Sequence, residues 1–141
     1  MKSALEVAEA RIQIESDSDI VAARQKGRAL GIQLGFSAAN ATILATAISE
    51  LARNILQYAG RGEIVLQPNS SENGSAAGLT VLARDQGPGI PDLRQAMMDG
   101  FSTSGRLGLG LPGVKRLMDE FEIVSVSGLG TSVTVKKWNH R

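Results

Sequence analysis

The feature that most constrains this chain is a glycine-rich stretch from Val81 to Gly113, which holds seven of the sixteen glycines in 141 residues. The stretch begins within an apolar run that is typical of a strand, and its last glycines precede the start of a helix. Glycine lets backbone N–H groups approach a ligand closely, and the start of a helix attracts anions through its unpaired N–H groups and its dipole. A strand end followed by such a helix start predicts a nucleotide-binding site.

Length and charge set the first limits on the class of protein. A chain of 141 residues indicates one domain with a core of its own. We expect a short flexible leader over residues 1–10 and the domain proper over 11–141. Fifteen basic and fourteen acidic residues give a net charge of +1, and neither sign forms a run of five. Electrostatics therefore points to neither a nucleic acid nor a membrane as a partner.

Composition also limits the chemistry. Without cysteine the chain has no disulfide, thiol nucleophile or thiolate metal site. The single histidine, His140, is next to the last residue, so we expect a solvated tail residue there and no histidine-based triad or metal cluster. No apolar stretch approaches the roughly 18 to 20 residues that span a bilayer, and Glu6 and Glu9 lie where a signal peptide would be apolar. We therefore expect a soluble, cytoplasmic protein.

The hydrophobic pattern predicts the element order strand, helix, helix, strand, strand, helix, strand, strand. The strands are expected over residues 11–15, 63–67, 79–85, 122–127 and 132–138. The longer helices are expected from about 16–20 to Gly35, from a cap at Ser37 or Asn40 to about Ala59, and from Leu111 to about Glu120. Between them we expect an exposed loop over 68–77, a short helix over about 92–99, a mobile lid over 100–106 and a tight turn over 128–131. This order predicts an α/β two-layer sandwich, with a mixed, mostly antiparallel sheet and helices on one face.

The helix that ends near Ala59 has two distinct faces. Its apolar stripe consists of Leu44, Ile48, Leu51, Ile55 and Tyr58. Glu50 and Asn54 are four residues apart and stack on another face. On this helix alone, a solvated polar face is the simpler interpretation.

Asp85 ends the third expected strand on the same side as the apolar residues Leu79, Val81 and Ala83. A carboxylate in that position costs free energy unless a donor binds it. Two donors are candidates: the turn that contains Gly87, and the amine of a ligand.

Four short motifs occur in a fixed order, each on an element assigned above. They are ELARN at 50–54, DQGPG at 85–89, GLGLPGVK at 108–115 and GLGT at 128–131. Together they resemble the four boxes of the GHKL ATPase and kinase superfamily. The segments TAISELARNI, RDQGPGIPD, DGFSTS and LPGVKRLMDEF are further similar to the small switch serine/threonine kinases of the RsbT type, which belong to the stressosome. The resemblance extends from about Ile20 to Trp138 and implies a Bergerat fold, in which ATP lies between the helix layer and a lid and magnesium bridges its phosphates.

The resemblance also implies a role for individual residues. Asn54 matches the magnesium ligand, and its amide oxygen is a hard donor of the kind that this ion accepts. Glu50 matches the proposed general base, which would take a proton from an attacking hydroxyl, or from water in a plain ATPase. Asp85 matches the residue that accepts the exocyclic amine of adenine, and Gly87 and Gly89 match the turn beside the base.

Further positions follow from the same motifs. Thr131 matches a residue that supports the adenine site by a direct or water-mediated hydrogen bond. The loop whose backbone N–H groups meet the phosphates consists of Gly108, Leu109, Gly110 and Leu111. Arg106 is expected to meet the γ-phosphate and stabilise transition-state charge, or to contact the protein substrate, or to be a solvated lid residue. Lys115 and Arg116 are weaker candidates for such contacts, and the alternative for each is a place on the exposed face of the last helix.

The function implied by the resemblance is ATP- and magnesium-dependent phosphorylation of a serine or threonine hydroxyl on a partner protein. The implied acceptors are a small STAS-domain antagonist and its co-antagonist scaffold, and the released kinase would then activate a PP2C-type phosphatase. The alternatives are a nucleotide-gated module that sequesters a regulator such as a sigma factor, and a plain ATPase of the gyrase or mismatch-repair kind. Glu50 beside Asn54 favours catalysis over sequestration, because a binding module needs no base. The absence of a transducer domain and of a basic surface signal argues against the plain ATPase.

Overall fold

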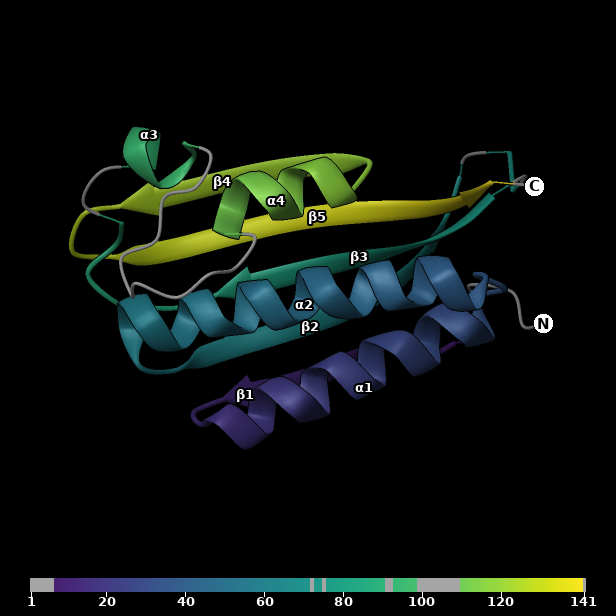
Figure 1. Ribbon diagram of the computed structural model, residues 1–141, viewed down its shortest axis with the longest axis horizontal. Helices are drawn as coiled ribbons and strands as arrows, with labels where there is room; N and C mark the ends of the chain where they lie inside the picture. The colour runs from purple at the N-terminus through teal and green to yellow at the C-terminus, as the bar shows by residue number, and fades with distance from the viewer. Residues whose placement is uncertain (1–6, 72, 75, 91–92, 99–109, 141) are drawn as a thin grey trace.

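The computed structural model places a layer of helices on one face of a five-stranded sheet (Figure 1). The structure describes residues 7–71, 73–74, 76–90, 93–98 and 110–140. The elements, in chain order, are β1 (Ala10–Ile14), α1 (Asp17–Gln33), α2 (Ala38–Ala59), β2 (Gly62–Ser70), β3 (Ala76–Arg84), α3 (Leu93–Ala96), α4 (Gly110–Leu117), β4 (Glu120–Val126) and β5 (Gly130–His140). The predicted element order is confirmed.

The sheet has the strand order β1-β2-β3-β5-β4, and each ladder between the described strands is antiparallel. This confirms the predicted two-layer α/β sandwich with a mostly antiparallel sheet. Because β5 pairs with β3 as well as with β4, the end of β3 and the start of β5 lie side by side, with Arg84 opposite Ser132. The topology thereby brings Asp85 next to Thr131, which is 46 residues further along the chain.

Local signals set the ends of the two long helices. The Asp19 carboxylate accepts a hydrogen bond from the backbone N–H of Ser16 at 3.2 Å, which caps the start of α1. Ser37 Oγ accepts from the backbone N–H of Asn40 at 3.1 Å, so Ser37 caps α2. Gly60, with φ of 79°, ends α2 in the left-handed conformation that favours glycine.

The core lies between the helix layer and the inner face of the sheet. Leu44, Ile48, Leu51 and Ile55 of the predicted stripe are buried, whereas Tyr58 is half-buried. Each fully buried side chain of this size stabilises the fold by roughly 1.5 to 3 kcal/mol. The stripe fixes the rotation of α2 about its axis and thereby decides where the polar face of this helix points.

The predicted loop over 68–77 is too long. β2 continues through Ser70 and β3 begins at Ala76, with Ala77 buried opposite Ser70. Proline and asparagine are typical of loops, and they led to the predicted loop. The β1–β2 ladder ends at Leu66, however, so among the described strands Pro68 lies where β2 pairs with β3 alone. A strand tolerates proline at such an edge, because its missing N–H is not needed there.

The boundaries in the last third of the chain also differ from those predicted. α4 ends at Leu117 instead of Glu120, because the backbone N–H of Asp119 donates to Lys136 in the sheet at 2.9 Å. β4 consequently starts at Glu120. β5 starts at Gly130, which places Thr131 in the strand and leaves residues 127–129 as the tight turn. The structure shortens the expected helix over 92–99 to α3, although residues 92 and 99 lie outside the described part.

Other expectations concern the ends of the chain and the lid. The expected lid over 100–106 lies outside the described residues. Of the expected leader, Val7 is 6% exposed and belongs to the core, and Ala10 opens β1. The backbone of His140 is not a tail, because it pairs with Ala76 in the sheet. No helix in the described part of the chain is both long and apolar enough to cross a membrane.

Candidate functional site

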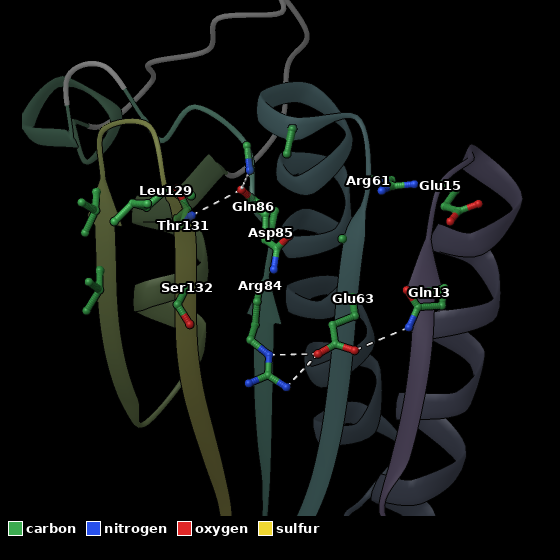
Figure 2. A pocket seen from close by; sticks show the side chains of 16 residues that line it. Gln13, Glu15, Arg61, Glu63, Arg84, Asp85, Gln86, Leu129, Thr131 and Ser132 are labelled. Carbon is green, nitrogen blue, oxygen red and sulfur yellow. Dashed lines mark hydrogen bonds and ion pairs between the residues drawn. The ribbon is translucent and has the colours of Figure 1, made fainter.

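Asp85 follows the last residue of β3, and its backbone N–H donates to the carbonyl oxygen of Thr131 at 3.0 Å. Its Oδ1 accepts from the backbone N–H groups of Gly87 at 2.9 Å and of Thr131 at 3.3 Å (Figure 2). The capping role that the sequence suggested is therefore present. The other carboxylate oxygen has no hydrogen-bond partner among the described residues, so the same side chain can also accept from a ligand.

The turn after Asp85 requires glycine at both predicted positions. A Cβ on Gly87 would lie 2.5 Å from Cβ of Ala59, at the end of α2. Gly89 has φ of 85°, and its Cβ would lie 2.9 Å from the carbonyl oxygen of Val126. The turn thus packs closely against the end of α2 on one side and against β4 on the other. Figure 2 shows Asp85 and Thr131 meeting at this end of the sheet.

A cavity lies between α2 and the inner face of the sheet, next to this turn. Its polar side chains include those of Asn54, Asp85 and Thr131, and its walls are mainly apolar, from Leu51, Ile55, Tyr58, Ala83, Ile90, Leu111 and Val133. Apolar walls with a few convergent polar groups are typical of small-molecule sites. The volume of the cavity, about 20 Å³, is room for about one water, so its walls would have to separate before a flat, mainly apolar base with an amine on its edge could enter. The cavity unites three residues that the sequence had placed on three separate motifs.

Asn54 supplies the polar group on the α2 side of the cavity. Its Nδ2 is buried and has no hydrogen-bond partner among the described residues. An unpaired buried amide is costly, and it indicates that a bound group completes the site. Because the amide can turn to present its oxygen instead, Asn54 fits a hydrated cation or a phosphate oxygen.

Glu50 lies one helical turn before Asn54, about 6 Å along α2, and does not line the cavity. Its side chain is only 14% exposed, so the simple interpretation of a fully solvated face is wrong. Glu50 Oε1 accepts a hydrogen bond from Arg53 Nη1 at 2.7 Å, and the Arg53 side chain is 37% exposed. This ion pair is placed to orient the candidate general base.

The helix start predicted as a phosphate site is only partly described. Gly110 opens α4 with φ of 60°, and Leu111 is buried and lines the cavity. Arg106, Gly108 and Leu109 lie outside the described residues. Lys115 and Arg116 are both exposed on α4.

Sequence reasoning missed Ser125 on β4. Its Oγ accepts from the backbone N–H of Ile90 at 2.8 Å and lies 2.9 Å from Thr131 Oγ1, where either hydroxyl can donate. A signal was present, because Phe121 and Ile123 alternate along β4 and Ser125 breaks this apolar series. Only the pairing of β4 with β5, however, puts Ser125 opposite Thr131.

A larger hollow of about 880 Å³ lies on the uncovered face of the sheet (Figure 2). Two of its charged side chains pair with one another, since Glu63 Oε1 is 2.7 Å from Arg84 Nη2, and Glu63 Oε2 also accepts from the side chain of Gln13 at 3.5 Å. Asp85 and Thr131 line both spaces, whereas Asn54, with its unpaired amide nitrogen, lines the smaller cavity. We assign the candidate site to the smaller cavity because it brings Asn54 together with Asp85 and Thr131.

Comparisons with known proteins identify the family of the chain. Residues 15–137 match the family described as a histidine kinase-like ATPase domain. The chain is 55% identical over 127 residues to the serine/threonine-protein kinase RsbT of Bacillus subtilis (strain 168). This alignment covers 90% of this chain and 94% of the relative. It is also 31% identical over 97 residues to the anti-sigma F factor of Thermoanaerobacter sp. (strain X514), over 66% of each protein.

Among solved structures, the RsbU and RsbW domains from Mycobacterium tuberculosis match with a TM-score of 0.61. The match covers 93% of this chain and 32% of that chain at 17% identity, so it supports the fold alone. The cavity, its capped carboxylate and its orphaned amide all lie within residues 15–137. This match and the identity to RsbT over nearly the whole chain show that the protein belongs to the histidine kinase-like ATPase family, as a switch serine/threonine kinase of the RsbT type.

Proposed function

We propose that this protein transfers the γ-phosphoryl group of ATP, with magnesium, to a serine or threonine hydroxyl of a partner protein. One observation carries the proposal: the cavity extends from Asp85 to Asn54, and α2 continues from Asn54 to Glu50. The expected adenine-binding residue Asp85, the candidate cation ligand Asn54 and the candidate general base Glu50 thus follow one another in this order. The 55% identity to a serine/threonine-protein kinase supports the same activity.

In this proposal Asp85 accepts the exocyclic amine of adenine and Thr131 binds the adjacent edge of the base. The Asn54 amide oxygen would hold the magnesium ion, which would neutralise phosphate charge when bound. Glu50 takes the proton of the acceptor hydroxyl while the oxygen of that hydroxyl attacks the γ-phosphorus. The bond between the γ-phosphorus and the bridging oxygen of the β-phosphate breaks, and ADP leaves. The start of α4 at Gly110 and Leu111, with Gly108, Leu109 and Arg106 before it, would contact the phosphates.

The partners belong to the same proposal. STAS-domain antagonist and co-antagonist scaffold proteins of a stressosome are the expected acceptors, and a PP2C-type phosphatase is the expected target of the released kinase. The similarity to an anti-sigma F factor favours a second candidate, a nucleotide-gated module that sequesters a regulator. Both candidates need the cavity, but only the kinase needs Glu50.

The test is a transfer reaction with the purified full chain, magnesium, γ-labelled ATP and a STAS-domain partner, with products identified by mass spectrometry. We expect a phosphoserine or phosphothreonine on the partner and ADP in equal amount. A nucleotide-dependent complex without a phosphorylated partner would favour sequestration instead. Release of inorganic phosphate alone would indicate an ATPase, and either result would overturn the kinase proposal.

A further inference from the structure

The inner face of β5 changes from apolar to polar toward the end of the strand. Side chains alternate along a strand, so Val133, Val135, Lys137 and Asn139 share the face that is turned to the helix layer. Val133 and Val135 are buried in the core, whereas a lysine and an asparagine occupy the next two inward positions. Polar side chains on an inner face cost free energy unless they find hydrogen-bond partners there.

Each of these two polar side chains binds the C-terminal end of a helix. Lys137 Nζ donates to the carbonyl oxygen of Leu117, the last residue of α4, at 3.3 Å. Asn139 Nδ2 donates to the carbonyl oxygen of Leu34, the C-cap of α1, at 3.3 Å. The last carbonyl groups of a helix lack partners within the helix, and a cation beside them also interacts favourably with the helix dipole. The end of β5 therefore caps two helices of the layer.

Further hydrogen bonds tie the end of α4 to β5. The backbone N–H of Asp119 donates to the carbonyl oxygen of Lys136 at 2.9 Å, and Asp119 Oδ2 accepts from the backbone N–H of Trp138 at 2.7 Å. With eight residues α4 is only about 12 Å long. Its other end, at Gly110 and Leu111, is the expected phosphate contact, and Leu111 lines the cavity. A helix this short moves as one rigid unit, so its anchor at one end also sets the direction of the N–H groups at the other.

We propose that Lys137 is a positioning residue, which fixes α4 on β5 and thereby aims the start of this helix at the phosphates of ATP. This inference rests on the proposed nucleotide site. Lys137 does not line the cavity, so it acts through the helix and not through contact with the nucleotide. N–H groups bind a phosphate oxygen only in a suitable direction, whereas apolar contacts with a base depend little on direction. Loss of the anchor should therefore weaken binding of the phosphates more than binding of the base.

The test compares ATP with adenosine, which has the same base and ribose but no phosphate. Binding of each to the full chain with magnesium is measured by calorimetry, without a partner protein. Lys137→Met keeps a side chain of similar length but has no donor. In this variant we expect the ATP affinity to fall roughly three- to fivefold, in the range of a helix end that acts on an anion. The adenosine affinity should change by less than about twofold, so the ratio of the two affinities falls.

Three variants separate positioning from a merely structural role. Asn139→Leu is the matched control, because it removes the cap of α1, and none of the described residues that line the cavity belongs to α1. Its melting temperature should fall about as much as that of Lys137→Met, while its ATP affinity stays at the wild-type value. Lys136→Met, on the opposite face of β5, removes the same charge and should change neither affinity. Lys137→Arg keeps a cation and should retain most of the ratio.

An equal loss of ATP affinity in Asn139→Leu would overturn the proposal, because any loosening of the helix layer would then have the same effect. An unchanged ratio of ATP to adenosine affinity in Lys137→Met would overturn it as well. If this variant does not fold, Lys137→Gln, whose uncharged side chain is one bond shorter, gives the same comparison.

Failure of the underlying nucleotide site would look different. In that case the wild-type chain would not bind ATP, or Asp85→Asn would bind it unchanged, and both proposals would fall. If the wild type binds ATP and Asp85→Asn does not, an unchanged ratio in the Lys137 variant rejects the role of Lys137 alone.

Discussion

The two ends of the candidate site differ in how completely the protein satisfies its own polar groups. At the Asp85 end, the carboxylate, Thr131 and Ser125 are held by backbone and hydroxyl hydrogen bonds from three segments. At the α2 end, the Asn54 amide nitrogen is buried without a partner in the described part of the chain, and Glu50 is held by one partly exposed arginine. The difference suggests that the fold itself prepares recognition of the base, whereas ligand and partner complete the reacting end.

Glu50→Ala should have the largest effect and act only on the reacting end. Loss of a general base typically lowers a rate by about 10² to 10⁴, so we expect phosphoryl transfer to fall by roughly a factor of 1,000. ATP affinity should change less than twofold, since Glu50 does not line the cavity. The measurements are single-turnover transfer and nucleotide binding. Transfer at the wild-type rate would show that another group takes the proton.

Asp85→Asn should act on the opposite end. The amide keeps an oxygen for the N–H groups of Gly87 and Thr131 but loses the charge that strengthens the bond to an amine, so we expect ATP affinity to fall roughly 100-fold. The melting temperature should stay close to that of the wild type, which calorimetry checks. Glu63→Gln, on the uncovered face of the sheet, is the matched control and should bind ATP normally. Normal ATP binding by Asp85→Asn would contradict a prepared base site.

Gly87→Ala tests whether the prepared end is rigid. The new Cβ would lie 2.8 Å from Cα of Ala59, so either the turn or the end of α2 must move. Overpacking of this kind costs about 1 to 3 kcal/mol, and we expect a matching loss in the free energy of unfolding together with weaker ATP binding. Gly74→Ala, where a Cβ would meet nothing within 4 Å but φ is 69°, serves as the control for backbone strain alone. Equal ATP affinities in the two variants would mean that the turn adapts.

Arg53→Gln should have the smallest effect. An ion pair this exposed contributes about 1 kcal/mol or less, so the expected loss in kcat for transfer is at most about fivefold. KM for ATP should stay the same, because Arg53 does not line the cavity. Arg53→Lys should recover most of the rate if the pair orients Glu50. A change in KM for ATP with unchanged kcat would show instead that Arg53 belongs to nucleotide binding.

Much of the fold could be predicted because its signals are local. The caps at Ser16 and Ser37, the stop at Gly60 and the apolar stripe of α2 depend on residues within a few turns of one another. Strand ends were less predictable. Whether Pro68 continues a strand, and whether Asp119 leaves the helix to bond to the sheet, depends on a partner strand that is distant in the sequence, and composition does not contain that information.

The sequence by itself determined the kind of site, because the motif glycines at 87 and 89 and the spacing of Glu50 and Asn54 follow from backbone geometry and helix periodicity. Only the tertiary structure decided which polar groups are satisfied. The insertion of β5 between β3 and β4 puts Thr131 against Asp85 and Ser125 against Thr131, while leaving the amide of Asn54 unpaired among the described residues. Hydrogen-bond partners separated by dozens of residues come together only when the sheet forms, since non-local pairing depends on topology and not on local propensity.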